Sequence, residues 1–275
     1  NLRDRLAKIS SPILKSNTAL CGKVGPDFGA VTHTLKSYPK KLREAAKREV
    51  GAGDEPRILY VRAGSPAERA GFKVGDYLET AKGKRIEARS KKLHNLIEAG
   101  EPVIRVRGGV KTPITVPHEP QCDYAVKLKM TSTINAYATG GSIIMTAGMM
   151  DFVTSDAELA AIIGHELAHN ELSHIRKILT NLILTAYGTR YTREFESEAD
   201  YVGLYYTARA EFDIDDVGTM WRRLGKLTVR PIARPKTHPT FPDRFVRLAA
   251  ARDEINAKRS AGQPLIPNFK DARDP

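Results

Sequence analysis

The sequence predicts an α+β fold: a mainly helical domain with a small sheet, interrupted by a β-rich module. Two observations support this prediction. Apolar residues recur at helical spacing in and before the stretch Ile163-Gly-His-Glu-Leu-Ala-His169, whereas short strands separated by glycine-containing turns occupy residues 45–118. A chain of 275 residues is also long enough for one large or two smaller packed domains. We therefore expect residues 1–44 and 119–275 to form the helical domain, and residues 45–118 to form the module.

The central helix of this prediction begins near Ser155, because Ser155 and Glu158 have the spacing of a capping box. Its buried face is predicted from apolar residues at helical spacing, namely Leu159, Ile162, Ile163 and Leu167. His165 and His169 lie four residues apart, so both imidazoles project from one side of the helix. Further helices are expected over residues 90–99 and 213–227 and from Asp243 onward.

The two histidines have the chemistry of metal ligands. Neutral imidazoles at this spacing suit two positions of a tetrahedral Zn²⁺, at about 2.0–2.1 Å from the metal. Glu166 lies beside the first histidine, where it can act as a general base on water without binding the metal itself. His-Glu-x-x-His is the signature of a zinc peptidase. Alone, the pattern also fits an ordinary helix with surface histidines, because a hydrolytic zinc site needs a third protein ligand.

A second motif downstream offers that ligand. Glu196 and Asp200 are four residues apart on one helical face, so Glu196 can complete a His₂Glu site. Asp200 can accept a hydrogen bond from a ligand imidazole and so hold its tautomer. The alternative is a solvated acidic face, which fits Glu194 and Glu198 better because they fall on other faces. Both motifs in this order favour the functional interpretation.

With these motifs the chain resembles metallopeptidase family forty-eight, the gluzincin-type zinc peptidases that include the CAAX prenyl protease, HtpX and the periplasmic protease-chaperone BepA. The resemblance covers roughly residues 119–250. It is carried by four segments, namely His165-Glu-Leu-Ala-His169, Glu196-Ser-Glu-Ala-Asp200, Thr237-His-Pro239 with Arg244, and Asn135-Ala-Tyr-Ala with Gly140-Gly-Ser-Ile-Ile-Met-Thr146.

The resemblance implies specific roles for these residues. One Zn²⁺ per chain is expected, held by His165, His169 and Glu196. Asp200 is expected to support a ligand imidazole. Glu166 and His238 are the expected catalytic residues, with His238 stabilising the oxyanion and Arg244 supporting it.

The predicted strands before the helix that carries His165 and His169 are a candidate substrate-binding site. Two short strands are expected around Gly140 and Gly141, and an exposed edge there can pair with an extended peptide. The candidate substrate-binding residues are Asn135, Ala136, Tyr137, Ser142, Ile143 and Ile144. An ordinary sheet edge is the alternative.

The module at residues 45–118 resembles a PDZ domain of the bacterial type. The resemblance rests on the run Gly64-Ser-Pro-Ala to Ala70-Gly-Phe to Gly75-Asp76. It implies a groove that binds a peptide ligand by strand addition. Residues 50–54 take the place of the carboxylate-binding loop but depart from its usual apolar pattern, so the binding of free C-termini stays open. A spacer or lid is the alternative.

The composition and net charge of the chain limit the classes of partner that we expect. The net charge of +12 comes with basic clusters that are not interleaved with aromatic residues, so we expect no nucleic acid partner. Weak attraction to an anionic membrane surface stays open. No apolar window reaches the 18 or so residues of a membrane span, so no transmembrane segment is expected in this chain. Cys21 and Cys122 fit a disulfide bond and two buried thiols equally well.

Together these features predict a zinc-dependent endopeptidase that cleaves protein or peptide substrates. We expect it in cell-envelope protein quality control, in the periplasm or secreted from a bacterial cell, with membrane association left open. Two other classes stay in view. One is a peptide-binding or chaperone protein led by the PDZ-like module, with a latent metal site. The other is a scaffold that adheres to surfaces through its positive charge.

Overall fold

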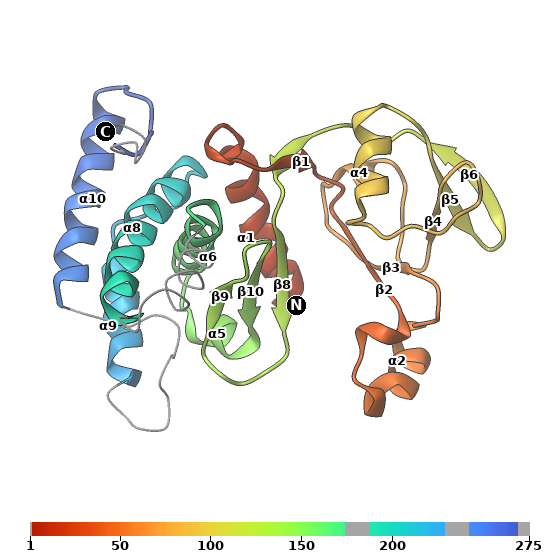
Figure 1. Cartoon of the computed structure of the whole chain (residues 1–275), viewed down its shortest axis with the longest axis horizontal. Coiled ribbons are helices and arrows are strands. Elements are labelled where there is room, and N and C mark those ends of the chain that lie inside the picture. The colour runs from red at the N-terminus through yellow and green to blue at the C-terminus, as the bar shows by residue number, and fades with distance from the viewer. Residues whose placement is uncertain (1, 174–187, 229–241, 269–275) are drawn as a thin grey trace. The chain divides into compact units, whose positions relative to one another are not determined.

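The computed structural model describes residues 2–173, 188–228 and 242–268 of the chain. The chain divides into two compact units (Figure 1). Each unit has its own hydrophobic core. We call residues 1–23 with 122–275 the helical unit, and residues 24–121 the inserted unit. The combination of helices and sheets agrees with the predicted α+β class.

The helical unit holds most of the helices. They are α1 (Leu2–Ser16), the 3₁₀ helix η1 (Thr18–Leu20), α5 (Ala147–Phe152), α6 (Asp156–Glu171), α8 (Gly188–Arg209), α9 (Val217–Thr228) and α10 (Pro242–Ser260). Its sheet has three strands in the order β8-β10-β9, which are β8 (Ala125–Lys129), β9 (Ala136–Ala138) and β10 (Ser142–Thr146). Strand β10 runs parallel to β8 and antiparallel to β9, so β9 is an edge strand.

Helix α6 is the centre of the helical unit. It packs against α8, and also against α1 and the sheet (Figure 1). Every residue from 158 to 170 is buried, as is typical of a helix enclosed on all sides. The predicted start is confirmed, because the Ser155 hydroxyl accepts a hydrogen bond from the Glu158 amide at 3.1 Å.

Helix α1 continues through Pro12. A proline inside a helix removes one backbone hydrogen bond. Ile9 and Ile13 on either side of Pro12 are both buried in the main core, and this packing compensates for the lost bond.

The inserted unit is built on a five-stranded antiparallel sheet in the order β2-β3-β4-β5-β6. Its strands are β2 (Ala30–His33), β3 (Arg57–Val61), β4 (Tyr77–Glu79), β5 (Val103–Arg107) and β6 (Val110–Ile114). Its helices are η2 (Leu35–Ser37), η3 (Lys40–Leu42), α2 (Arg43–Val50), α3 (Pro66–Arg69) and α4 (Lys91–Glu98). Strands β1 (Val24–Pro26) and β7 (Pro120–Cys122) pair where the chain enters and leaves this unit.

The boundary of the inserted unit differs from the one drawn from the sequence. Residues 24–44 and 119–121, which the sequence pattern assigns to the helical domain, belong to the inserted unit. The reason is strand pairing: Ala30 of β2 lies opposite Val61 of β3, so β2 is part of the inserted sheet. A boundary at residue 45 would also cut helix α2.

Cys21 and Cys122 form a disulfide bond, with their Cα atoms 5.7 Å apart. Of the two alternatives that the sequence left open, the structure therefore contains the bonded form. Among the described residues, no helix is long and apolar enough to cross a membrane.

Candidate metal centre

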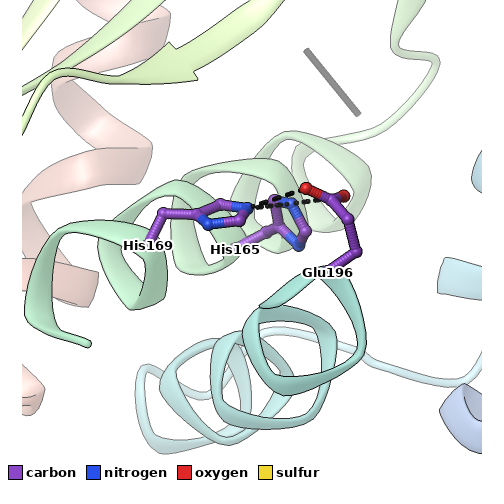
Figure 2. A group of neighbouring side chains, drawn as sticks. All are labelled: His165, His169 and Glu196. Carbon is purple, nitrogen blue, oxygen red and sulfur yellow. Dashed lines mark hydrogen bonds and ion pairs between the residues drawn. The ribbon is translucent and has the colours of Figure 1, made fainter. Parts of the chain in front are cut away.

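Three side chains with metal-ligating atoms meet between α6 and α8. His165 and His169 come from α6 and Glu196 from α8, and their ligand atoms point toward one another (Figure 2). The two histidine Nε2 atoms are 3.0 Å apart. Glu196 Oε2 lies 3.6 Å from Nε2 of His165, and Oε1 lies 3.3 Å from Nε2 of His169. All three residues are buried.

This donor set fits a zinc ion. Ligand atoms bound at about 2.0–2.2 Å in a tetrahedral arrangement lie about 3.3 Å from one another. The two imidazole nitrogens are 3.0 Å apart, and each lies 3.3–3.6 Å from a Glu196 oxygen, Oε2 for His165 and Oε1 for His169, so the separations are close to that value. Two imidazole nitrogens and one carboxylate oxygen are also the ligands of a hydrolytic zinc site of the His₂Glu class.

The pKa values of the two histidines are shifted in opposite directions. Burial lowers the pKa of His169 to about 4, so this imidazole is neutral near pH 7. Burial also opposes a charge on His165, but the carboxylates of Asp200 and Glu196 outweigh it. The pKa of His165 is therefore raised above its ordinary value.

Asp200 and Arg244 form a buried support behind His165. Asp200 Oδ1 is 2.9 Å from Nδ1 of His165. Arg244 donates two hydrogen bonds to the same carboxylate, from Nε at 2.5 Å and from Nη2 at 2.7 Å. Burial alone would raise the pKa of Asp200, but Arg244 and His165 outweigh it and lower that pKa. The ionised Asp200 leaves Nε2 of His165 as the nitrogen that faces the metal position.

Of the two predicted catalytic residues, Glu166 lies within the described residues and His238 does not. Glu166 is buried on α6, and its charge acts on both His169 and Arg244, so it lies close to the cluster. His238 lies outside the described residues. The predicted role of Arg244 beside His238 thus stays a prediction, whereas its contact with Asp200 is observed.

The six candidate substrate residues lie on two different strands. Ala136 and Tyr137 belong to the edge strand β9 and Asn135 directly precedes it, whereas residues 142–144 belong to the central strand β10. The backbone of β10 pairs with β8 on one side and with β9 on the other. Residues 142–144 therefore have no free edge for a substrate, whereas β9 lies at an edge of the described sheet.

Sequence reasoning missed two residues near the cluster. Asn170, buried directly after His169, accepts a hydrogen bond from the Gly140 amide at 2.7 Å and donates one to the Ser142 carbonyl at 3.1 Å. A polar residue at the end of a buried helix was the available signal. Trp221 of α9 places its ring centroid 5.2 Å from that of His165. Nothing in the sequence pattern distinguished it from an ordinary core residue.

Two segments of the chain, residues 103–189 and 177–255, match the model of peptidase family M48. Together they span more than half of the chain, and the chain belongs to this family.

Three relatives illustrate the similarity. The chain is 30% identical over 142 residues to mitochondrial metalloendopeptidase OMA1 of Arabidopsis thaliana, an alignment that covers 43% of this chain and 29% of the relative. It is 25% identical over 174 residues to the protein of the same name from Schizosaccharomyces pombe, covering 50% and 51%. It is 25% identical over 164 residues to the beta-barrel assembly-enhancing protease of Escherichia coli, covering 46% and 33%. The chain thus spans about a third to a half of these curated relatives.

Proposed function

We propose that this chain is a zinc-dependent endopeptidase that cleaves protein or peptide substrates, with one Zn²⁺ per chain. The observation that carries the proposal is the buried cluster of His165, His169 and Glu196, whose separations match a tetrahedral zinc site. Membership of peptidase family M48 and the metalloendopeptidase names of the relatives support the same class.

The chain's own residues divide the work of hydrolysis. When bound, zinc supplies a Lewis acid that lowers the pKa of water and polarises the scissile carbonyl. Glu166 takes the proton of the attacking water and delivers it to the leaving amine. Asp200, held by Arg244, keeps His165 in the orientation that ligation requires. His238 is proposed to donate a hydrogen bond to the developing oxyanion.

We propose the edge strand β9 as the place where an extended substrate pairs. Its outer side has no partner strand in the described sheet, and α6 packs next to it. Asn170 joins the turn between β9 and β10 to the end of α6, one residue beyond the ligand His169. The position of a substrate strand paired with β9 would therefore depend on the position of α6, which carries His165 and His169.

For the inserted unit we propose a PDZ-like role in peptide recruitment. The strand-rich architecture with the edge strand β2 supports this proposal, because strand addition needs an exposed edge. The chain enters β2 through residues 27–29, so this segment, rather than residues 50–54, takes the position of a loop that leads into the binding strand. A peptide-binding or chaperone protein with a latent metal site is the alternative function.

We propose an extracytoplasmic location in the cell envelope. The Cys21–Cys122 disulfide bond supports an oxidising compartment. The names of the relatives mention mitochondria and β-barrel assembly. We propose protein quality control in the cell envelope as the setting of this chain.

The proposal is tested by incubating the full chain with unfolded casein, with and without a zinc chelator. We expect cleavage that the chelator stops and added zinc restores. Glu166→Gln should bind zinc but not cut, whereas Glu194→Gln, an exposed carboxylate on α8, should cut normally. Cleavage that persists in Glu166→Gln, with contaminating proteases excluded, would falsify the assignment. Suppression of casein aggregation without cleavage by the wild-type chain would favour the chaperone alternative.

A further inference from the structure

Trp221 touches two members of the metal centre without offering a ligand atom. Its ring centroid lies 3.7 Å from the guanidinium carbon of Arg244 and 5.2 Å from the ring of His165. The first distance is well within the range of about 6 Å for a cation–π contact. The indole is almost fully buried, so water does not compete for either contact.

Arg244 needs such a partner. It is fully buried, and its guanidinium bonds Asp200 along one edge while Nη1 lies 3.5 Å from Glu196 Oε2. These contacts are made by the nitrogen atoms at the edge of the planar guanidinium group, and none of them acts on its face. The indole covers its face and prevents the guanidinium from tilting out of that plane.

The three side chains Arg244, Asp200 and His165 form a continuous series of contacts. Asp200 bonds Arg244 at one end and His165 at the other, and Trp221 packs on both ends. A tilt of Arg244 would move the Asp200 carboxylate, and with it the partner that orients His165. Trp221 therefore constrains the ligand both directly and through its support.

Helix α9 is itself anchored to the metal helix. Arg223, two residues after Trp221, donates two hydrogen bonds of 2.7 Å to the carboxylate of Glu158 in the first turn of α6. This bidentate pair fixes the position of α9 along α6. The indole is thus held in register with His165, which lies about two turns further along α6 than Glu158.

We propose that Trp221 is a positioning residue of the metal centre, which holds Arg244 and His165 in the arrangement that binds zinc. The inference rests on the zinc site of the proposed function. It goes beyond that function because it assigns a role to a residue outside the metal motifs. A purely structural role would make Trp221 one more member of the core.

The first experiment measures zinc affinity by competition with a chromogenic chelator. The metal-free full chain is used in the Glu166→Gln background, so that self-cleavage cannot interfere. Loss of an outer partner of a ligand typically weakens metal binding about 10–100-fold, and we expect a loss in this range for Trp221→Leu. Trp221→Phe keeps an aromatic face for Arg244 and should recover most of the affinity.

Met220→Ala is the matched control. Met220 is fully buried in the same core and adjoins Trp221 in sequence, about 100° around the helix. This substitution should lower the melting temperature, as deletion of buried apolar volume does, but leave the zinc affinity unchanged. Equal affinity losses in Met220→Ala and Trp221→Leu would reduce Trp221 to a core residue and overturn the proposal.

The second experiment uses the fact that Trp221 is the single tryptophan of the chain. Its fluorescence should be quenched when Co²⁺ is added to the metal-free protein, and the quenching should saturate at one equivalent. Co²⁺ that binds with unchanged fluorescence would contradict the contact between Trp221 and the ligand His165. A wild-type chain that binds neither Zn²⁺ nor Co²⁺ would instead refute the proposed function, which separates the two failures. Wild-type affinity in Trp221→Leu would refute this inference alone.

Discussion

Gly164 of α6 lies directly against Gly203 of α8. A Cβ atom built on Gly164 would lie 2.5 Å from the carbonyl oxygen of Gly203, and one built on Gly203 would lie 2.6 Å from the backbone nitrogen of His165. The two helices therefore cross at a point where neither can carry a side chain. This close approach brings Glu196 and Asp200 of α8 within reach of the two histidines on α6.

Gly203→Ala should separate the two helices and weaken the site. Overpacking of this kind costs about 1–3 kcal/mol of stability, and the displaced Glu196 should lower zinc affinity as well. Gly218→Ala in α9 is the control, because a Cβ there meets no atom within 4 Å. Thermal melts and zinc titrations on both variants check the prediction. A Gly203→Ala protein with normal melting and normal zinc binding would show that the crossing tolerates a side chain.

Glu196→Gln should lose zinc together with activity, because an amide is a poor substitute for the charged third ligand. Metal content after dialysis, measured by atomic absorption, provides the check. Glu194→Gln changes an exposed carboxylate on the same helix and should retain one zinc per chain. Unchanged metal content in Glu196→Gln would place the third ligand elsewhere.

Zinc binding should release about one proton at pH 5.5 rather than two. Metal ligands must be deprotonated before they bind. In the metal-free site the raised pKa of His165 keeps its proton at this pH, whereas His169, with a pKa of about 4, has already lost its proton. Two unperturbed histidines would both be largely protonated. Isothermal titration calorimetry in buffers of different ionisation enthalpy counts the protons, and a value near two would contradict these pKa shifts.

The lowered pKa of His169 also determines how this residue changes the stability of the metal-free fold with pH. Its folded pKa lies below its unfolded value of about 6.5, so the unfolded chain binds more protons between pH 6.5 and 4. His169 therefore destabilises the metal-free fold progressively as the pH falls through this window.

Asn170→Ala should impair cleavage while leaving zinc bound. Loss of its two hydrogen bonds frees the turn between β9 and β10 from the metal helix. A displacement of about 1 Å in a substrate-positioning element can cost a factor of about 10² in rate, and we expect a loss of kcat/KM approaching this size. Asn170→Asp keeps the acceptor for the Gly140 amide and should lose less. Wild-type kcat/KM in Asn170→Ala would remove the turn from substrate positioning.

His238→Ala should slow the enzyme. A hydrogen-bond donor to the oxyanion typically contributes a factor of about 10²–10³ to kcat. Steady-state kinetics on a peptide substrate measure the effect, with zinc content as the control. A faster enzyme would indicate instead that His238 occupies the open zinc position, and unchanged kcat and kcat/KM would exclude it from the site.

Local sequence signals were enough to predict several elements of the fold. The cap at Ser155, the helical spacing of His165 and His169, and the strands on either side of Gly140 depend on residues only a few positions apart. Each of these predictions agrees with the structure. The prediction that Glu196 joins the two histidines rested on the order of the two motifs along the chain. The spacing of residues within each motif could not by itself predict that α6 and α8 pack together.

The contacts between segments far apart in the chain became known from the three-dimensional structure. The position of β2 in the inserted sheet, the choice between β9 and β10 as the free edge, and the packing of Trp221 on His165 and Arg244 all depend on which elements become neighbours. The choice between a disulfide bond and free thiols at Cys21 and Cys122 is of the same kind. Such contacts join residues far apart in the chain, and their energies depend on three-dimensional packing that no local pattern encodes.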